Sequence, residues 1–296
     1  MHKIRIGSRG SDLALWQAEF VKSKLHFLGH EAEINVITTQ GDAIQNLSFD
    51  KMEGKGFFTK EIESALLKDE IDLAVHSYKD LETEQPEGLV VAAVSDREDP
   101  ADLLLVRKES VSEGQLWGIR AGAIVGTSSA RRKAQLRRFL PEAEIKDLRG
   151  NVPTRINKLR EEKYDAIMLA KAGVDRLGID LSEFHVEVMD PSEFVPAPAQ
   201  GALALQIRSS DSKLFDLLQK LNNSEVARRI GVERKVLNLL EGGCQLPLGV
   251  FCESDDKVHV AYTTNWERGS DLFTYETDDL DALPELIVED LLKSSH

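Results

Sequence analysis

Short apolar runs alternate with stretches of helical periodicity over the first third of the chain. Runs of four to eight apolar residues predict buried strands, whereas apolar positions three or four apart predict helices. Ser11 stands directly before such a helical stretch, and serine is a favoured N-cap residue. The expected strands are 3–6, 33–39, 71–75 and 89–94, and the expected helices are 12–28 and 59–68.

A second run of the same kind begins near Asp102. Its expected strands are 123–125, 144–148 and 166–169, and its expected helices are 129–139 and 153–161, with a short helix after the last strand. Strands that alternate with helices indicate parallel sheets in α/β layers. The sequence therefore predicts two α/β domains, which we expect to form a cleft.

Two proline-bearing segments, 97–100 and 195–198, mark the expected crossings between these domains, and the strand-like run 202–207 returns to the first sheet. From Ser224 the pattern changes to a long helix, three strands and a last helix, which predicts a small α+β C-terminal domain. The expected domains are residues 1–98 with 199–220, residues 99–198, and residues 221–296.

Composition places the chain among globular proteins, with 42% hydrophobic residues. No window approaches the roughly 20 apolar residues of a spanning helix, and the N-terminus lacks the apolar stretch of a secretory signal, so we expect a cytoplasmic protein. The two cysteines, Cys244 and Cys252, fit neither a disulfide framework nor a CxxC pattern. We expect no metal site.

Charge is distributed unevenly. Residues 120–160 hold eleven Lys or Arg against three Asp or Glu, a net charge of +8, whereas the whole chain carries −14. A basic island in an acidic protein is typical of a local site for a polyanion, although a solvated helix face would have the same composition.

Three turns that join a strand to a helix carry arginine. They are 7–11, 126–132 and 148–155. Backbone N–H groups at a helix N-terminus bind anions, and arginine adds donors. Arg131 and Arg132 in a first helical turn oppose the helix dipole, a conflict that a bound anion would remove. The alternative is ordinary capped turns with exposed arginines.

The segment from His76 to Asp80 follows an apolar strand. Asp80 beside Lys79 at a strand end is a candidate acid, base or cation-stabilising group, and the alternative is a surface ion pair. His76 is interpreted as a hydrogen-bonded structural group.

Cys244 follows two glycines in a loop after a helix. A thiol on such a loop suits a nucleophile or a covalent attachment point, although a buried structural cysteine remains the alternative on chemistry alone. Cys252 lies in a strand-like run and is expected in the core.

Together these segments resemble the porphobilinogen deaminase family over nearly the whole chain. The similarity rests on many ordered motifs rather than on one. They are 8–18, Thr39-Gln40-Gly41-Asp42, 53–58, 76–80, 97–100, 126–132, 148–155, Ala199-Gln200-Gly201-Ala202 and 241–247.

The resemblance implies a monomeric three-domain transferase whose first two domains are similar to bilobal periplasmic-type binding proteins. It implies a dipyrromethane cofactor attached through a thioether to Cys244, condensation of four porphobilinogen molecules with loss of ammonia, and hydrolytic release of hydroxymethylbilane. It places the catalytic carboxylate at Asp80. The implied cofactor and substrate contacts are Arg9, Ser11, Lys55, Ser77, Lys79, Thr127, Ser128, Ser129, Arg131, Arg132, Arg149, Gly150, Arg155, Arg176 and Gln200.

The residues agree with this implication, because every pyrrole unit carries two carboxylates and a growing chain is a polyanion. Some positions differ from the residues that are common in the family. Gln40 replaces a common basic residue, Gln206 replaces a frequent acid, and Pro198-Ala199-Gln200-Gly201 replaces a more glycine-rich segment; Tyr78 and 81–83 also differ. These departures concern finer contacts and the crossing segment rather than Asp80 or Cys244.

Two other functions remain open. One is a non-catalytic bilobal anion-binding protein, which needs neither Asp80 nor a thiol on a C-terminal loop. The other is RNA binding by 120–160, against which the aromatic content of 6% counts. We expect a small-molecule substrate, no nucleic acid and no membrane partner.

Overall fold

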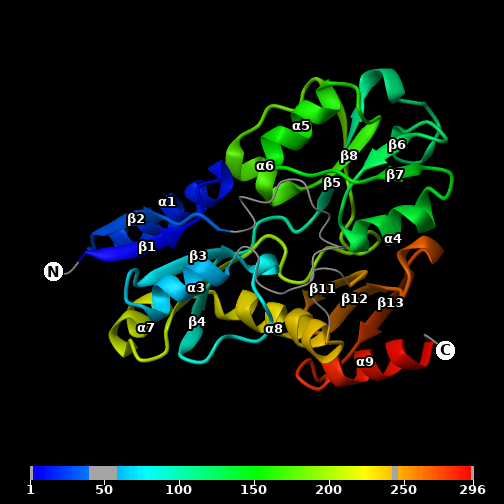
Figure 1. The fold of residues 1–296 in the computed structure, drawn as a ribbon. Coiled ribbons are helices and arrows are strands. Elements are labelled where there is room, and N and C mark those ends of the chain that lie inside the picture. The colour runs from blue at the N-terminus through cyan, green and yellow to red at the C-terminus, as the bar shows by residue number, and fades with distance from the viewer. Residues whose placement is uncertain (1–2, 40–58, 242–245, 295–296) are drawn as a thin grey trace. The chain divides into compact units, whose positions relative to one another are not determined.

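The computed structural model describes residues 3–39, 59–241 and 246–294. The chain divides into two compact units (Figure 1). Of the described residues, 3–39, 59–98 and 201–228 form the first unit, and 99–200 with the residues from 229 onward form the second. The chain therefore crosses between the units at 98–99 and 200–201 and again within a helix at 228–229.

The first unit is built on a five-stranded sheet of order β2-β1-β3-β10-β4. Its strands are β1 (Ile4–Ser8), β2 (Ala32–Val36), β3 (Leu73–Ser77), β4 (Leu89–Val94) and β10 (Leu203–Arg208). β1 is parallel to both of its neighbours, whereas β10 is antiparallel to β3 and β4. The predicted return of the strand near 202–207 to the first sheet is confirmed.

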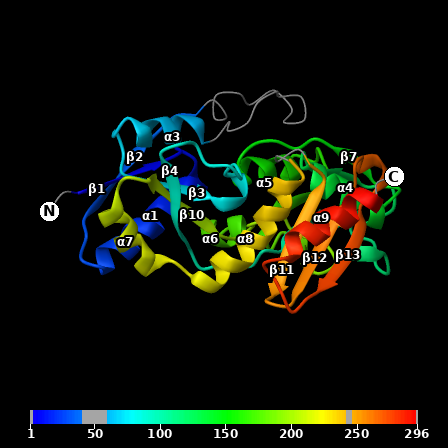
Figure 2. The ribbon, with the colours of Figure 1, turned by 90° about the horizontal axis from the view of Figure 1, so that it is seen from below.

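Helices cover both faces of this sheet. They are α1 (Asp12–Phe27), α3 (Lys60–Leu67) and α7 (Ser212–Leu218), with the short 3-10 helices η2 (Tyr78–Asp80) and η5 (Gln219–Leu221). Leu73 and Val75 pack with α1 and α7, whereas Ala74 between them packs with α3. Alternate residues of a strand point to opposite faces, so α3 lies on the other side of the sheet from α1 and α7, as Figure 2 shows.

The second unit contains a sheet of the same design, of order β7-β6-β8-β5-β9. Its strands are β5 (Asp102–Arg107), β6 (Ile124–Gly126), β7 (Glu144–Lys146), β8 (Ala166–Ala170) and β9 (Phe184–Val188). As in the first sheet, three neighbouring strands are parallel and the fourth, β5, is antiparallel to both of its neighbours. Two sheets with one topology explain why the sequence shows the same strand–helix pattern twice.

The helices of this sheet are α4 (Ala130–Phe139), α5 (Val152–Arg160) and α6 (Lys171–Leu177). Leu104 and Val106 of β5 pack with α4, and Leu103 and Leu105 pack with α5 and α6. The continuous apolar run of β5 is therefore covered on both faces. The short 3-10 helices η3 (Lys108–Ser110) and η4 (Leu116–Gly118) follow β5.

A three-stranded antiparallel sheet completes the second unit. Its strands are β11 (Leu248–Ser254), β12 (Lys257–Tyr262) and β13 (Asp271–Glu276), with η6 (Trp266–Arg268) between the last two. Helices α8 (Ser224–Leu239) and α9 (Leu283–Ser294) supply the apolar side chains that cover it. The predicted fold class, two α/β sheets and a small C-terminal α+β part, is confirmed, and the division into three domains stays a prediction.

Among the described strands and α-helices, β5, β9 and α7 were not foreseen from the sequence. No helix in the described part of the chain is long and apolar enough to cross a membrane. Among the described residues, no group of three His, Cys, Asp or Glu side chains is placed to hold a metal ion.

Candidate active site

The candidate residues of the first unit lie at the carboxyl ends of two adjacent parallel strands. Arg9 and Ser11 follow β1, and the segment from Ser77 to Asp80 follows β3. Carboxyl ends of parallel strands meet at one edge of a sheet, which is where α/β proteins place their ligands. Ser11 caps α1 as predicted, since its Oγ accepts a hydrogen bond from Ala14 N at 3.4 Å.

Gln17, which was not among the predicted site residues, joins these two segments. Its Nε2 donates to Ser77 Oγ at 2.9 Å, and the Gln17 side chain comes from the buried face of α1. The only signal in the sequence is an amide among the apolar positions of a helix.

Asp80 ends the 3-10 helix η2, which is anchored at both ends. Tyr78 N donates to Ala202 O at 3.0 Å, and Leu81 after the helix is 3% exposed in the core. Asp80 itself is exposed. A rigid turn therefore presents an accessible carboxylate, with Lys79 before it in the chain.

His76 is buried in a chain of amides and carboxylates. Its Nε2 lies 3.0 Å from Gln206 Oε1, and Gln206 Nε2 donates to Glu63 at 3.0 Å and to Gln85 at 2.7 Å. Because Gln206 Nε2 has both hydrogens committed, its Oε1 must accept, which assigns the proton of His76 to Nε2. Burial lowers the pKa of His76 to about 4. This neutral, enclosed ring agrees with the structural interpretation of His76.

In the second unit, two of the predicted turns meet at one sheet edge. Residues 127–129 follow β6 and residues 147–151 follow the parallel neighbour β7. Ser128 Oγ donates to Leu148 O at 3.1 Å and accepts from Leu148 N at 3.0 Å. The hydroxyl of Ser128 therefore fastens one turn to the other.

Both turns lead into capped helices. Ser129 Oγ accepts from Arg132 N at 3.4 Å at the start of α4, and Asn151 Oδ1 accepts from Thr154 N at 2.9 Å at the start of α5. Thr127, buried at 3% exposure, accepts from Ser129 N at 3.2 Å through its Oγ1. The helix N-termini that the sequence predicted are present.

Gly150 precedes the second cap with φ of +113°, and a Cβ there would lie 2.6 Å from Thr154 Cγ2. Only glycine fits such a conformation and space. Arg155 Nε donates to Gly150 O at 2.7 Å, so this arginine bends back onto the turn. Arg149 lies in the same turn, between Leu148 and Gly150.

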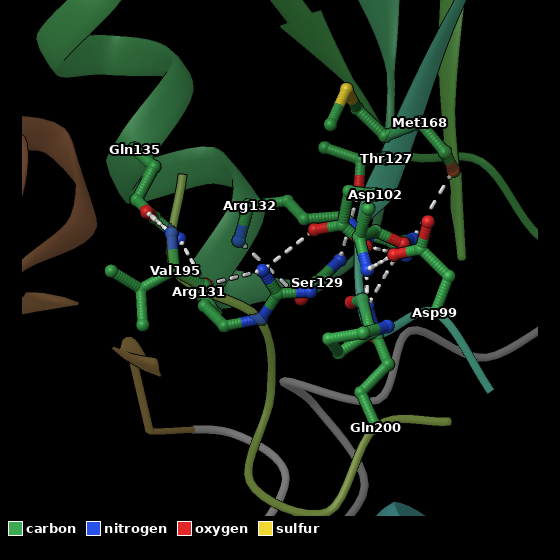
Figure 3. Close-up of polar contacts among 12 residues, drawn as sticks. Asp99, Asp102, Thr127, Ser129, Arg131, Arg132, Gln135, Met168, Val195 and Gln200 are labelled. Carbon is green, nitrogen blue, oxygen red and sulfur yellow. Dashed lines mark hydrogen bonds and ion pairs between the residues drawn. The ribbon is translucent and has the colours of Figure 1, made fainter. Parts of the chain in front are cut away.

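Arg131 and Arg132 are 4% and 5% exposed, and both bind the carboxylate of Asp102 (Figure 3). Arg131 Nη1 donates to Asp102 Oδ2 and Arg132 Nη2 donates to Asp102 Oδ1, each at 2.7 Å. Burial opposes ionisation of Asp102, but the two guanidiniums outweigh it and hold the pKa of this carboxyl well below its usual range. These two arginines are therefore not exposed, and they already have an anionic partner within the protein.

Gln200 belongs to the same cluster. It is 1% exposed, and its Nε2 donates to Asp102 Oδ1 at 2.9 Å and to Pro100 O at 2.6 Å. Arg176, 9% exposed, stands in the last turn of α6. The structure therefore gives Gln200 a partner within the protein, and its predicted contact with a ligand stays a prediction.

Lys55 and Cys244 lie outside the described residues. Cys252 is 2% exposed, its thiol donates to Ser254 O at 3.1 Å, and its backbone N donates to Glu233 Oε1 at 2.9 Å. The expected core position of Cys252 is confirmed.

The fold and these turns define an α/β protein with arginine-bearing helix entries at the carboxyl edges of its parallel strands. Residues 4–216 match the family described as porphobilinogen deaminase, dipyromethane cofactor binding domain. The chain belongs to the porphobilinogen deaminase family.

Relatives support this assignment over most of the chain. It is 45% identical to a porphobilinogen deaminase of Oceanobacillus iheyensis, covering 86% of this chain and 82% of that one. It is 46% identical to the Gloeobacter violaceus protein of that name, covering 85% and 76%, and 43% identical to the Bacillus velezensis one, covering 88% and 82%.

Among solved structures, the periplasmic VFT2 domain of Bordetella pertussis BvgS is 13% identical with a TM-score of 0.44, covering 78% of this chain and 92% of that one. An ancestral cationic amino acid solute binding protein is 16% identical with a TM-score of 0.42, covering 74% and 90%. Scores of this size carry no conclusion about ligands.

Proposed function

We propose that this chain is a hydroxymethylbilane synthase, a transferase of tetrapyrrole biosynthesis. It condenses four porphobilinogen molecules in steps, with loss of ammonia at each, and releases hydroxymethylbilane by hydrolysis. The observation that carries the proposal is the buried pair Arg131 and Arg132 at the N-terminus of α4, in a chain of this family. Two buried guanidiniums with one carboxylate, Asp102, leave a net charge of +1 that a ligand carboxylate would balance.

The residues present fit an acidic dipyrromethane. The Nε atoms of Arg131 and Arg132 are buried and have no hydrogen-bond partner among the described residues, and a buried donor without an acceptor is costly. Further donors at this edge would come from the backbone N–H of Ser128, the hydroxyl of Ser129 and the guanidinium of Arg149. When bound through Cys244, the dipyrromethane supplies the free pyrrole carbon to which the first substrate unit is joined.

Asp80 is the proposed catalytic carboxylate. In each condensation the bond between the aminomethyl carbon and nitrogen breaks and ammonia leaves, a new carbon–carbon bond forms, and the attacked pyrrole carbon loses its proton. Loss of ammonia makes the substrate an electron-poor cation, which a fixed carboxylate stabilises. Asp80 also suits the transfer of a proton to the leaving amine and from the new bond.

The remaining candidates are proposed to bind the carboxylates of substrate and product. In the first unit they are Arg9, Ser11, Ser77 and Lys79, and Lys55, outside the described residues, is proposed with them. In the second they are Thr127, Gly150, Arg155, Arg176 and Gln200. Three domains, a monomer and a cytoplasmic location belong to the same proposal.

The test is incubation of the purified protein with porphobilinogen, with ammonia and hydroxymethylbilane both measured. We expect one ammonia for each unit incorporated. Binding of porphobilinogen without release of ammonia would overturn the proposal in favour of a non-catalytic anion-binding protein.

A further inference from the structure

We propose that Asp102 is a positioning residue, one that holds Arg131 and Arg132 in the orientation that receives a ligand carboxylate. The inference rests on the proposed function and deepens it. It states that a buried residue that touches no ligand determines the orientation of the anion-binding arginines at the start of α4. Asp102 is the first residue of β5, and it is 0% exposed.

Each guanidinium is fixed at two points. Besides Asp102, Arg131 Nη1 donates to Val195 O at 2.9 Å, and Arg132 Nη1 donates to Met168 O at 3.2 Å. A planar guanidinium held by two acceptors on one side cannot rotate freely about its long side chain. The two groups therefore keep one orientation, which Figure 3 shows.

This arrangement leaves the Nε donor of each group uncommitted among the described residues. With Nη atoms bound to Asp102 and backbone carbonyls, the buried Nε atoms of Arg131 and Arg132 are the donors without a partner among the described residues. Burial lowers the pKa of Arg131 even though Asp102 opposes that shift, so the cation lies in a poorly solvated place. A carboxylate that reached this place would meet donors that already point in fixed directions, which reduces the entropy lost on binding.

Asp102 also reaches the second crossing of the chain. Its Oδ1 accepts from Gln200 Nε2 at 2.9 Å. Val195 in the same segment donates from its N to Gln135 Oε1 at 2.6 Å and accepts from Gln135 Nε2 at 2.9 Å. Asp102 and Gln135 together thus hold α4 and residues 195–200 in a common arrangement.

Removal of the charge at Asp102 would leave two guanidiniums facing each other in a dry interior. Like charges there repel strongly, so at least one arginine would turn toward water and lose the orientation that suits a ligand carboxylate. If Asp102 did not position the arginines, the loss of its negative charge would only make the cluster more positive, and anion binding would become stronger. The two ideas therefore predict opposite changes for Asp102→Asn.

The experiment compares Asp102→Asn with Asp165→Asn, the whole protein being purified with the cofactor it acquires. Asp165 is a matched control, since it is a buried carboxylate of the same unit that accepts from Ser110 Oγ at 2.6 Å, Arg120 Nη2 at 2.9 Å and Ile124 N at 2.8 Å. We measure the fraction of molecules that carry the cofactor by intact mass, KM and kcat for porphobilinogen, and the thermal midpoint.

Both variants are expected to lower the thermal midpoint. Only Asp102→Asn should lose cofactor, and its KM should rise by about tenfold or more, with a smaller change in kcat, as for loss of a charge-assisted hydrogen bond. Asp102→Glu, which keeps the charge one methylene away, should recover part of the cofactor. If Asp102→Asn does not fold, Asp102→Glu carries the test, and it should show cofactor loss out of proportion to its change in thermal midpoint.

A spectroscopic readout separates positioning from stability. The ¹H–¹⁵N signals of the Arg131 and Arg132 Nε groups should be sharp and shifted in the wild type and should move to the position of solvated arginine in Asp102→Asn. Full cofactor and an unchanged KM in Asp102→Asn, at the stability of Asp165→Asn, would overturn the inference. Absence of cofactor and product in the wild type would instead overturn the proposed function.

Discussion

Asp102 Oδ1 accepts a hydrogen bond from Arg132 Nη2 at 2.7 Å, with the carboxylate 0% and the arginine side chain 6% exposed. The protein itself therefore supplies one anion at the helix entry where the sequence predicts that an anion is required. The structural and functional interpretations of these arginines are not alternatives, because the same side chain serves both.

Arg132→Leu should accordingly destabilise the protein. The change leaves Asp102 buried with one guanidinium instead of two, and breaking a buried ion pair typically costs about 3–5 kcal/mol. Arg155→Leu is the matched control, since Arg155 is only half-buried and makes an exposed hydrogen bond to Gly150 O, so its loss should cost less than about 1 kcal/mol. Urea denaturation of both cofactor-free proteins measures the difference. Equal free energies of unfolding would contradict the structural part of this assignment.

The sequence predicted the parts of the fold that depend on local chemistry. Ser11, Ser129 and Asn151 cap helices because short polar side chains satisfy the free N–H groups of a first turn. The apolar runs identified most strands, with shifts of up to three residues at their ends. The alternation of strands with helices predicted parallel strands, and the run 202–207 predicted a strand that returns to the first sheet.

What the sequence left out depends on contacts between distant residues. Asp102 precedes a run of leucines and looks like an ordinary polar residue before a strand, and only the fold places Arg131 and Arg132 beside it. Gln17 pairs with a residue 60 positions away. A charged or amide group at the border of an apolar run is the one signal that would have singled them out, because such a group needs a partner when it is buried.

Ala199 has φ of +63°, in the left-handed region that favours glycine. This is where the resemblance showed a departure from a more glycine-rich segment. The backbone is held there because Ala199 N donates to the buried Glu233 Oε2 at 2.7 Å. In the folded protein this conformation costs an alanine about 1–2 kcal/mol of strain. A glycine would avoid the strain but would lower the free energy of unfolding by about 0.4–1 kcal/mol, because it gives the unfolded chain more conformational freedom.

Ala199→Gly should therefore raise the free energy of unfolding by about 0.5–1 kcal/mol, measured by urea denaturation. Ala197→Gly, two residues earlier and without a positive φ, should lower it. A lower stability for both variants would show that the strain at Ala199 is negligible.

His76 predicts a dependence of stability on pH. Its pKa falls from 6.5 to about 4 because burial disfavours the charged ring. The unfolded chain takes up a proton between these values and the folded protein does not, so this contribution is complete above pH 6.5 and is lost as the pH falls toward 4. At about 1.4 kcal/mol for each pKa unit, the loss is on the order of 3 kcal/mol.

Replacement of His76 by Asn should remove this dependence. The difference in free energy of unfolding between wild type and variant should shrink as the pH is lowered from 7 to 4.5, as measured by urea denaturation at several pH values. His26→Asn, at an exposed position of α1, serves as the control and should leave the slope unchanged. A constant difference across this range would contradict a neutral His76.

The intact mass should exceed the sequence mass by one dipyrromethane, attached to Cys244. Cys252 is 2% exposed and its thiol is bonded to Ser254 O, so it is a poor nucleophile in the folded protein. Cys244→Ala should purify without the added mass, and Cys252→Ala should keep it. An adduct located on Cys252 by peptide mapping would refute the assignment.

Asp80 is the residue on which the proposed chemistry depends most directly. Its turn is anchored by Tyr78 N and by the buried Leu81, so a substitution at the exposed side chain should leave the fold intact. Asp80→Asn preserves size and removes both the charge and the group that transfers protons. Turnover should fall by a factor of about one hundred or more, as for the loss of a main electrostatic group in a transition state.

Asp80→Glu keeps the charge but moves it by one methylene, so it should retain more activity than Asp80→Asn. Glu84→Gln removes a charge from an exposed position four residues away and should leave turnover unchanged. The measurement is steady-state formation of product from porphobilinogen, with each protein first loaded with cofactor and the loading checked by mass, so that a defect in assembly does not imitate one in catalysis. Since the charge and the proton-transfer group are lost together only in Asp80→Asn, near-normal turnover in the loaded variant would show that neither acts through this carboxylate. The proton transfers would then have to be assigned to another group, with the enclosed and neutral His76 a poor candidate on its position alone.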